Sequence, residues 1–376
     1  MKILGIESSC DETAASVVEI DEKNGSVKPL SSVISSQIKL HAKWGGVVPN
    51  LAAREHLRNI LPVIESSLAE AGVSKNEIDL MAVTHGPGLI PALLVGTNTA
   101  KTLGLAWNKP LMGIHHIEGH IYANFINKQD ADIQFPALCL VVSGGHTQLV
   151  LMKKHLVYEI IGETQDDAVG EAFDKVARIL GLGYPGGPVI SEAAIKFQIP
   201  NPKLQANSKS QIPNSKKAFS FPRPMLKKAN FDFSFSGLKT AVLYFVKKNP
   251  TEIKNKKFIA EVAYEFQQAA VEVLVTKTIR AAKKYSPKTI LLAGGVSANT
   301  ELQNQLAQAI VENLPKTKFS FPEIAYQLDN ATMIATAAFF RHRALANEKS
   351  LLSTWKNLQT KANLELPKKT ISKAKL

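Results

Sequence analysis

Leu138-Cys-Leu-Val-Val-Ser-Gly-Gly-His-Thr-Gln-Leu-Val150 is the stretch on which the fold class depends. Its first half predicts a buried strand, Ser143-Gly144-Gly145 predicts a tight turn, and the rest predicts a second strand. Glycine has no Cβ, so backbone N–H groups in such a turn can approach a bound anion closely. An isolated Ser-Gly-Gly is usually an ordinary hairpin turn, so the interpretation needs support from elsewhere in the chain.

Two further stretches give that support. Residues 2–19 repeat the order of strand, small polar turn and strand, with Asp11 and Glu12 in the turn. Residues 289–299 predict a buried strand that ends in a double glycine. Helical stretches alternate with strands between these points, which indicates an α/β class with parallel pairing. We therefore expect a duplicated nucleotide-binding fold, in which two α/β subdomains surround a cleft.

Periodicity predicts the other elements. Residues 50–71 should form an amphipathic helix that ends at Gly72, with an apolar face made of Leu57, Ile60, Leu61, Ile64 and Leu68. Further strands are expected at 79–84 and 110–114, and helices at 93–107, within 162–182, at 236–248, at 258–284, from Asn299 and from Asp329 to about 346. The expected division is 1–134, 135–328, a helix 329–346 that returns to the first subdomain, and a basic tail 347–376. Within the second subdomain, 198–217 reads as a basic, mobile surface insertion.

The chain is strongly basic. It has 45 Lys and Arg against 32 Asp and Glu among 376 residues, which gives a net charge of +13. This excess favours a polyanionic partner, although a generally basic proteome is the plainer explanation. The distribution favours a binding surface, because no acidic residue lies between Glu192 and Asp232 and several cations do: Lys196, Lys203, Lys209, Lys216, Lys217, Arg223, Lys227 and Lys228.

Composition also limits the cellular setting. No apolar run approaches the roughly 18 residues that a membrane helix needs. The N-terminal Met-Lys-Ile-Leu-Gly-Ile-Glu lacks the apolar region of a signal peptide. Cys10 and Cys139 are too few for a disulfide framework. We expect a cytoplasmic protein with no membrane association.

His115-His-Ile-Glu-Gly-His120 is the sharpest local signal for chemistry. His116 and His120 are four residues apart, so on a helix they share a face and could bind one metal ion. Histidines at this spacing are more often plain core or surface residues. A metalloprotease is a further alternative, but Glu118 would lie about 200° round the helix from His116, which suits a protease base poorly.

Carboxylates complete the candidate site. Asp329 opens the last predicted helix, where it is either a helix cap or the third ligand of an open, catalytic His₂-carboxylate set. Asp11 and Glu12 are either solvated at a hairpin tip or face the cleft. Asp167, Glu171 and Asp174 have the spacing of one helix face. That face is either solvated or presents Asp174 to a ribose or a substrate amine.

Several motifs occur in an order that resembles one known family: Ile6-Glu-Ser-Ser-Cys-Asp-Glu-Thr13, His115-His-Ile-Glu-Gly-His120, Val142-Ser-Gly-Gly-His-Thr-Gln-Leu149, Gly170-Glu-Ala-Phe-Asp-Lys175, Tyr184-Pro-Gly-Gly-Pro188, Phe233-Ser-Phe-Ser-Gly-Leu-Lys-Thr240 and Ala293-Gly-Gly-Val-Ser-Ala-Asn299. Over roughly residues 1–345 the chain resembles the bacterial tRNA N(6)-adenosine threonylcarbamoyltransferases, the TsaD family once called O-sialoglycoprotein endopeptidases. The resemblance implies an actin-like ATPase (ASKHA) fold. It also implies transfer of threonylcarbamoyl from threonylcarbamoyl-AMP to the adenosine 3′ of the anticodon, in tRNAs that read codons beginning with adenine.

The resemblance also implies a set of site residues and partners. The metal ligands would be His116, His120 and Asp329, holding one divalent ion, Fe(2+) or, less favoured, Zn(2+). Substrate contacts with the adenine nucleotide, threonylcarbamoyl-AMP or ATP, would come from Val141, Val142, Ser143, Gly144, Gly145, Asp174, Gly187 and Asn299. Asp11 or Glu12 is our candidate for orienting or deprotonating the attacking amine. The implied partners are tRNA, the paralogue TsaB and the ATPase TsaE.

The chain departs from the family pattern at a few points. Asp329-Asn-Ala-Thr-Met333 stands where the family has Asp-Asn-Gly-Ala-Met, and Pro91 follows the Gly86-Pro-Gly88 loop where glycine is commoner. An actin-like ATPase that serves as a scaffold or regulatory module, without transferase chemistry, remains the alternative from another functional class. It would explain the glycine turns but not the paired histidines.

Overall fold

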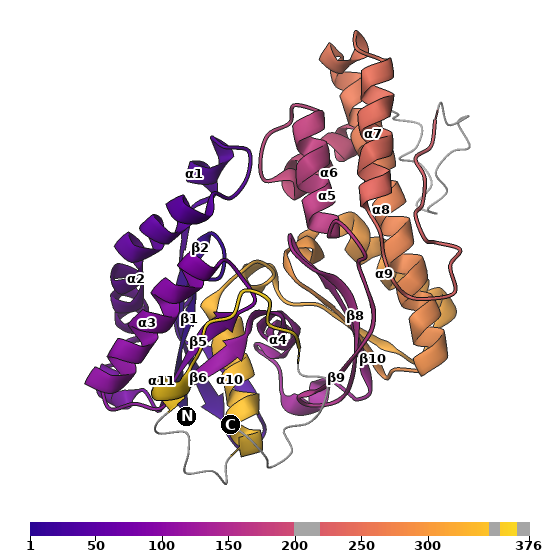
Figure 1. The fold of residues 1–376 in the computed structure, drawn as a ribbon. Coiled ribbons are helices and arrows are strands. Elements are labelled where there is room, and N and C mark those ends of the chain that lie inside the picture. Colours follow the sequence, from indigo (N-terminus) through magenta and orange to yellow (C-terminus); the bar gives the residue numbers. More distant parts are fainter. Residues whose placement is uncertain (199–218, 346–353, 367–376) are drawn as a thin grey trace.

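The computed structural model describes residues 1–198, 219–345 and 354–366. Within these ranges the chain forms two mixed β-sheets, each covered by helices (Figure 1). Between residues 2 and 21 and between 137 and 154, a strand, a short polar turn and an antiparallel strand follow one another as predicted.

The first sheet has the order β3-β2-β1-β5-β6, and β4 pairs with β2. Its strands are β1 (Lys2–Glu7), β2 (Glu12–Asp21), β3 (Ser26–Pro29), β4 (Val33–Ser36), β5 (Leu80–Gly86) and β6 (Leu111–His115). Leu4 and Ile6 of β1 pack toward the side of α2 (Pro49–Ala71) and α3 (Ile90–Ala106). Ile3, of opposite parity, packs on the other face, where α10 (Ala331–Leu345) crosses β1 and β2. Successive side chains of a strand point to opposite faces of the sheet, and helices cover both faces here. The residues of β1 are therefore apolar on both faces.

The second sheet has the order β11-β10-β7-β8-β9. Its strands are β7 (Ala137–Val142), β8 (Thr147–Lys154), β9 (Val157–Glu163), β10 (Thr289–Ala293) and β11 (Lys318–Ser320). Five helices belong to this half: α5 (Val169–Ile179), α6 (Gly186–Gln198), α7 (Ser236–Lys248), α8 (Lys256–Tyr285) and α9 (Thr300–Asn313). Leu138 and Leu140 pack toward these helices, whereas Cys139 and Val141 face the cluster that includes α10.

The short helix α4 (His116–Tyr122) lies between the two sheets, because it contacts β6 of the first and β7 and β10 of the second. The remaining short helices are α1 (Ile38–Ala42), α11 (Thr354–Asn357) and the 3₁₀ turns Lys75–Glu77, Ala123–Phe125, Asp130–Asp132, Glu252–Lys254, Gly295–Ala298 and Ile324–Tyr326. No helix in the described ranges has the length and apolar character needed to cross a membrane.

Some expectations were wrong. Leu57 and Leu61 are exposed, and the buried face of α2 instead uses Ala52, His56, Ile60, Val63, Ile64 and Ser67. Polar residues on this face find partners on β2 and in the loop after β3: His56 Nδ1 lies 2.7 Å from Thr13 Oγ1, and Ser67 Oγ lies 2.8 Å from Ser31 Oγ.

The helix predicted within 162–182 is α5, but it is shorter than expected, because the range begins with the end of strand β9 and a connecting loop. Asp167 therefore precedes the helix, and it pairs with Lys175 and Lys239 at 2.9 and 2.7 Å. The Tyr184-Pro-Gly-Gly-Pro188 motif is the entry to α6, which begins at Gly186. The predicted insertion 198–217 lies outside the described residues beyond position 198, as does the tail apart from 354–366.

Candidate metal centre

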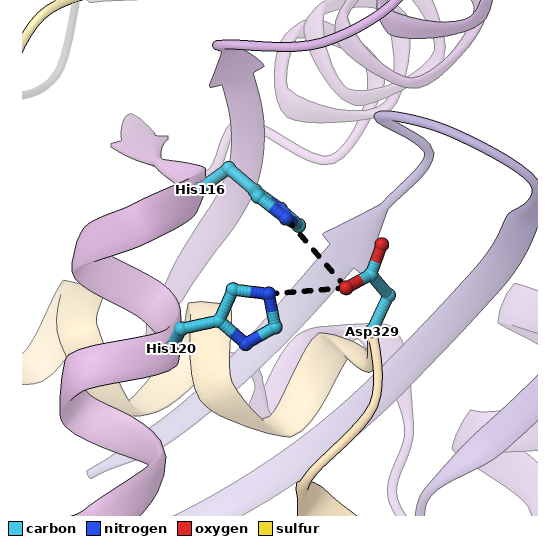
Figure 2. Close-up of side chains that lie close together, drawn as sticks. All are labelled: His116, His120 and Asp329. Atoms are coloured by element: carbon cyan, nitrogen blue, oxygen red, sulfur yellow. Dashed lines mark ion pairs between the residues drawn. The ribbon is translucent and has the colours of Figure 1, made fainter. Parts of the chain in front are cut away.

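The two histidines of the motif lie on α4, which begins directly after β6. His115 caps this helix, since its Nδ1 accepts the N–H of Ile117 at 3.1 Å. Burial lowers the pKa of His115 to about 3, so this imidazole is neutral. His116 and His120 follow on successive turns of the helix and both point toward Asp329 (Figure 2).

Asp329 reaches the histidines from the segment that precedes α10. Its Oδ1 lies 3.1 Å from His120 Nε2 and 3.6 Å from His116 Nε2. Asp329 is not the cap of α10, because the N–H of Met333 is accepted by Asn330 Oδ1 at 2.9 Å. The carboxylate is therefore free of capping and available as a ligand.

The three side chains fit a metal ion. One ligand atom from each lies within 4.8 Å of the others, and bonds of about 2.1 Å in a tetrahedral site place ligand atoms about 3.4 Å apart. His120 is fully buried. Its Nδ1 makes no hydrogen bond to the described residues, and its Nε2, although 3.1 Å from Asp329 Oδ1, lacks the geometry of one. Buried polar atoms normally have partners, so this site lacks a group that would satisfy His120. Three protein ligands leave a coordination position open, as in catalytic sites.

Glu7 fixes the orientation of His116. The Glu7 carboxylate is fully buried, and it accepts hydrogen bonds from Ser9 N–H at 2.5 Å and Thr84 Oγ1 at 2.6 Å. Its Oε2 lies 3.1 Å from His116 Nδ1, and Ser9 Oγ lies 3.2 Å from the same nitrogen. His116 Nδ1 donates to Glu7, and this leaves Nε2 directed at Asp329.

Charges within this cluster stabilise one another. Burial would lower the pKa of His116, but the Asp329 and Glu7 carboxylates raise it to about 9. Burial would raise the pKa of Glu7, but the adjacent His116 holds it below its usual range. The pKa of Asp329 is likewise held well below its usual range, because His116 and His120 outweigh the effect of burial.

The turn with Asp11 and Glu12 lies near this cluster. Asp11 is buried and Glu12 is half-buried, and Glu12 Oε1 accepts the Ser36 hydroxyl at 3.2 Å. Burial raises the pKa of Glu12 well above its usual range, and the charges of Asp11 and Asp329 add to the rise. A solvated hairpin tip would show neither effect.

The Ser143-Gly144-Gly145 turn follows β7, whose last residues Val141 and Val142 are buried. The turn is closed on itself: Ser143 N–H donates to His146 O at 2.8 Å, and His146 N–H donates to Ser143 Oγ at 3.1 Å. A Cβ added at Gly144 or Gly145 would meet nothing within 4 Å, so space lies open beside both. The folded chain itself does not require glycine there, which is consistent with room for a ligand.

Asp174, Gly187 and Asn299 belong to the helices of the second half: Asp174 lies on α5, Gly187 at the start of α6, and Asn299 directly before α9. Asp174 accepts the N–H of Gly186 at 2.7 Å, at the start of α6. Burial raises the pKa of Asp174, and Asp11 of the first sheet adds to the rise. A Cβ at Gly187 would meet nothing within 4 Å. The Asn299 side chain is engaged, because it caps α9 through Leu302 N–H at 2.9 Å and donates to Ser191 and Gln267 at 3.0 Å.

Glu118 is not available as a protease base. It is fully buried and forms a two-pronged ion pair with Arg341 of α10, at 2.9 and 2.6 Å. This pairing explains the glutamate in the motif structurally and removes the main support for a metalloprotease.

The sequence analysis missed some residues of the cluster. The sequence patterns assign no role to Glu7, Ser9 or Thr84, although a glutamate directly after the apolar stretch Ile3–Ile6 is a signal of a buried partner. His146 is a second omission. Burial, with the charges of His116 and His120, lowers the pKa of His146 to about 4, so His146 lies near the candidate ligands.

The two mixed sheets, their glycine turns and α4 between them define an actin-like ATPase (ASKHA) fold with a candidate His₂-carboxylate metal site. The fold is shared with HypF from T. kodakarensis (TM-score 0.58, 12% identity, 93% of this chain and 49% of that one). It is also shared with full-length HypF in a phosphate- and nucleotide-bound form (TM-score 0.55, 13% identity, 93% and 56%).

Sequence comparisons identify the family. The model of TsaD, tRNA N6-adenosine threonylcarbamoyltransferase, matches residues 28–336. Enzymes described by that name are 50% identical in Listeria monocytogenes (89% of this chain, 90% of the relative), 47% in Kosmotoga olearia (90% and 93%) and 48% in Bacillus subtilis (90% and 89%). The chain belongs to the tRNA N6-adenosine threonylcarbamoyltransferase family. It is a transferase that modifies tRNA, and the scaffold alternative is set aside.

Proposed function

We propose that His116, His120 and Asp329 hold the ion at which the threonylcarbamoyl group is transferred. The observation that carries this proposal is the convergence of the three side chains from two distant segments, with the Nδ1 of the buried His120 unpartnered and its Nε2 aimed at Asp329 without a hydrogen bond. The set suits Fe(2+), which we favour, or Zn(2+). A bound ion would supply Lewis-acid stabilisation to a phosphate or carbonyl oxygen of the donor.

The donor in this proposal is threonylcarbamoyl-AMP, bound in a cleft between the two sheets. In the Ser143–Gly145 turn, which follows Val141 and Val142, the backbone N–H groups of Gly144 and Gly145 would hold its phosphate together with the N–H of Gly187. The open space at the three glycines supports this placement. Asp174 would meet the ribose, and Asn299 would border the adenine. ATP could occupy the same turns.

The acceptor amine needs orientation, because its lone pair is delocalised into the adenine ring. Holding donor and amine in line, with charge stabilised as it develops, would provide most of the acceleration. Asp11 or Glu12 would orient or deprotonate the amine. The shared electrostatic environment of Glu12, Asp11 and Asp329 supports that role.

The acceptor proposed is the adenosine 3′ of the anticodon, in tRNAs that read codons beginning with adenine. Lys227 and Lys228 are exposed and suit a phosphate backbone, whereas Lys216 and Lys217 lie outside the described residues. We expect the reaction to take place in the cytoplasm.

We propose TsaB and TsaE as protein partners. Support for a protein interface comes from the adjacent helices α2 and α3, which expose Leu57, Leu61, Leu94 and Leu105. We also propose that residues 1–134 and the returning helix 329–346 act as one subdomain and 135–328 as the other.

Reconstitution tests the proposed centre. The purified chain, threonylcarbamoyl-AMP, tRNA and partner proteins should yield N(6)-threonylcarbamoyladenosine by nucleoside mass spectrometry. His120→Ala should lose both product and bound metal while keeping a cooperative unfolding transition. A metal-free His120→Ala variant with full activity would overturn the proposal.

A further inference from the structure

The C-terminal segment 358–366, which follows α11, lies against α4, the metal-ligand helix that carries His116 and His120. Figure 1 shows it, in yellow, crossing β5 and β6 and ending beside α4. Lys361 N–H donates to His85 O at 2.9 Å, and Gly88 N–H donates to Ala362 O at 3.1 Å. The segment thus covers the carboxyl ends of β5 and β6, and it lies outside the residues 28–336 that the family model matches.

The first sheet is shaped to receive this segment. Leu358 packs into the cluster between β1 and α3, and Leu366 is buried against the α10 side. A Cβ on Gly113 would overlap the Leu358 side chain, and one on Gly86 would overlap the Lys361 carbonyl. The segment is therefore part of the packed structure.

One contact connects the segment directly to the metal-ligand helix. His115 is 3% exposed, and its Nδ1 accepts the Ile117 N–H at the first turn of α4. The ring proton is therefore on Nε2, which lies 2.9 Å from the carbonyl oxygen of Leu364. Each nitrogen of this imidazole has one partner, and the segment supplies the second of them.

A second connection reaches His116 from the opposite side. The Gly86–Gly88 loop is bonded to Ala362, and the next residue, Leu89, donates its N–H to Ser9 O at 2.8 Å. Ser9 Oγ lies 3.2 Å from His116 Nδ1. The segment thus supports both the backbone that carries His116 and the hydroxyl beside its ring.

We propose that His115 is a positioning residue for the transferase, and that the C-terminal segment 358–366 is the strap that fixes it. This inference rests on the proposed metal role of His116 and His120. With the strap seated, His115 holds the first turn of α4 in the orientation that directs both ligands at Asp329. Metal ligands depend on such supporting contacts, whose loss typically weakens metal binding 10- to 100-fold.

Two variants separate positioning from simple helix capping. His115→Asn keeps a good helix cap but is too short to reach Leu364. A chain that ends at Ser353 keeps His115 but removes the strap. We expect both to bind Zn(2+) about tenfold more weakly than wild type in chelator competition. Amides of α4 should exchange hydrogen faster in both, with a lower kcat and an unchanged KM for tRNA.

The controls use the same chain. Thr360→Val removes the 2.9 Å contact between the Thr360 and Thr97 hydroxyls. This contact belongs to neither of the two connections to α4, so the variant should bind Zn(2+) with wild-type affinity. A synthetic peptide of residues 354–366 should restore affinity to the truncated chain but not to a truncated chain that also carries His115→Asn.

Wild-type Zn(2+) affinity in both His115→Asn and the truncated chain would overturn the inference while leaving the metal site intact. A loss of Zn(2+) affinity in the truncated chain alone would also overturn the inference, because the strap would then act without His115. Failure of the wild-type protein to bind Zn(2+) would instead overturn the proposed metal role and the inference with it.

Discussion

Replacing Glu7 with glutamine changes a single atom next to the proposed metal ligands. Glu7 Oε1 accepts the Ser9 N–H, and Oε2 accepts from Thr84 and lies 3.1 Å from His116 Nδ1. A backbone N–H can only donate, so the glutamine oxygen must remain at Ser9 and its NH₂ group must replace Oε2. The Thr84 hydroxyl can rotate to accept from this group, but His116 Nδ1 must then lose its proton.

In the neutral form of His116 that a metal ion requires, the single ring proton would then lie on Nε2, the atom that faces Asp329. We expect Zn(2+) affinity to fall 10- to 100-fold, or about 1.4 to 2.7 kcal/mol. Loss of the charge-assisted hydrogen bonds should lower the free energy of unfolding by about 2 kcal/mol. Chelator competition and urea denaturation measure the two effects.

Thr84→Val is the matched control. It removes one hydrogen bond from the same buried carboxylate without touching His116, so we expect a stability loss of about 1 kcal/mol and nearly unchanged Zn(2+) affinity. The reasoning is refuted if Glu7→Gln binds Zn(2+) as tightly as Thr84→Val does.

Three further predictions concern other parts of the chain. Burial lowers the pKa of Lys277 to about 8, so the folded state releases this proton before the unfolded state does and gains stability as pH rises from about 8 to 10.5. Relative to Lys277→Met, wild type should gain up to about 3 kcal/mol over that range in urea denaturation, and a pH-independent difference would contradict the assignment. Lys227→Glu with Lys228→Glu should weaken tRNA binding and flatten its salt dependence by about one unit per lost phosphate contact; identical salt slopes in filter binding would make these lysines plain surface. Glu118→Gln leaves the Arg341 charge buried without its partner and should lower the free energy of unfolding by about 3 kcal/mol with metal stoichiometry unchanged, so an equally stable variant would speak against the ion pair.

Local patterns in the sequence predicted the strands and turns well, because a double glycine after an apolar run has few other structural uses. The same patterns predicted the wrong residues for the buried face of α2. Leu57 and Leu61 have helical spacing, but the buried face carries His56 and Ser67, whose polar groups find partners on β2 and in the loop after β3. Hydrophobic periodicity cannot identify a buried polar residue whose hydrogen-bond partner is distant in the sequence.

The site shows the same limit. The histidine spacing and the family resemblance predicted the set that the fold brings together, although the capping alternative for Asp329 could be decided only when Asn330 was seen to cap α10. Glu7 was missed because it pairs with a histidine 109 residues away. The contact of Leu364 with His115 spans 249 residues, and no local pattern marks it.

The most direct measurement of the central claim is the rate of N(6)-threonylcarbamoyladenosine formation against added metal, starting from metal-free protein. The rate of the wild-type protein should increase with added Fe(2+) or Zn(2+) and reach a plateau at one ion per chain. Asp329→Ala should stay inactive at the same metal additions. Full activity of the metal-free wild type, or restoration of Asp329→Ala by one equivalent of metal, would contradict the account.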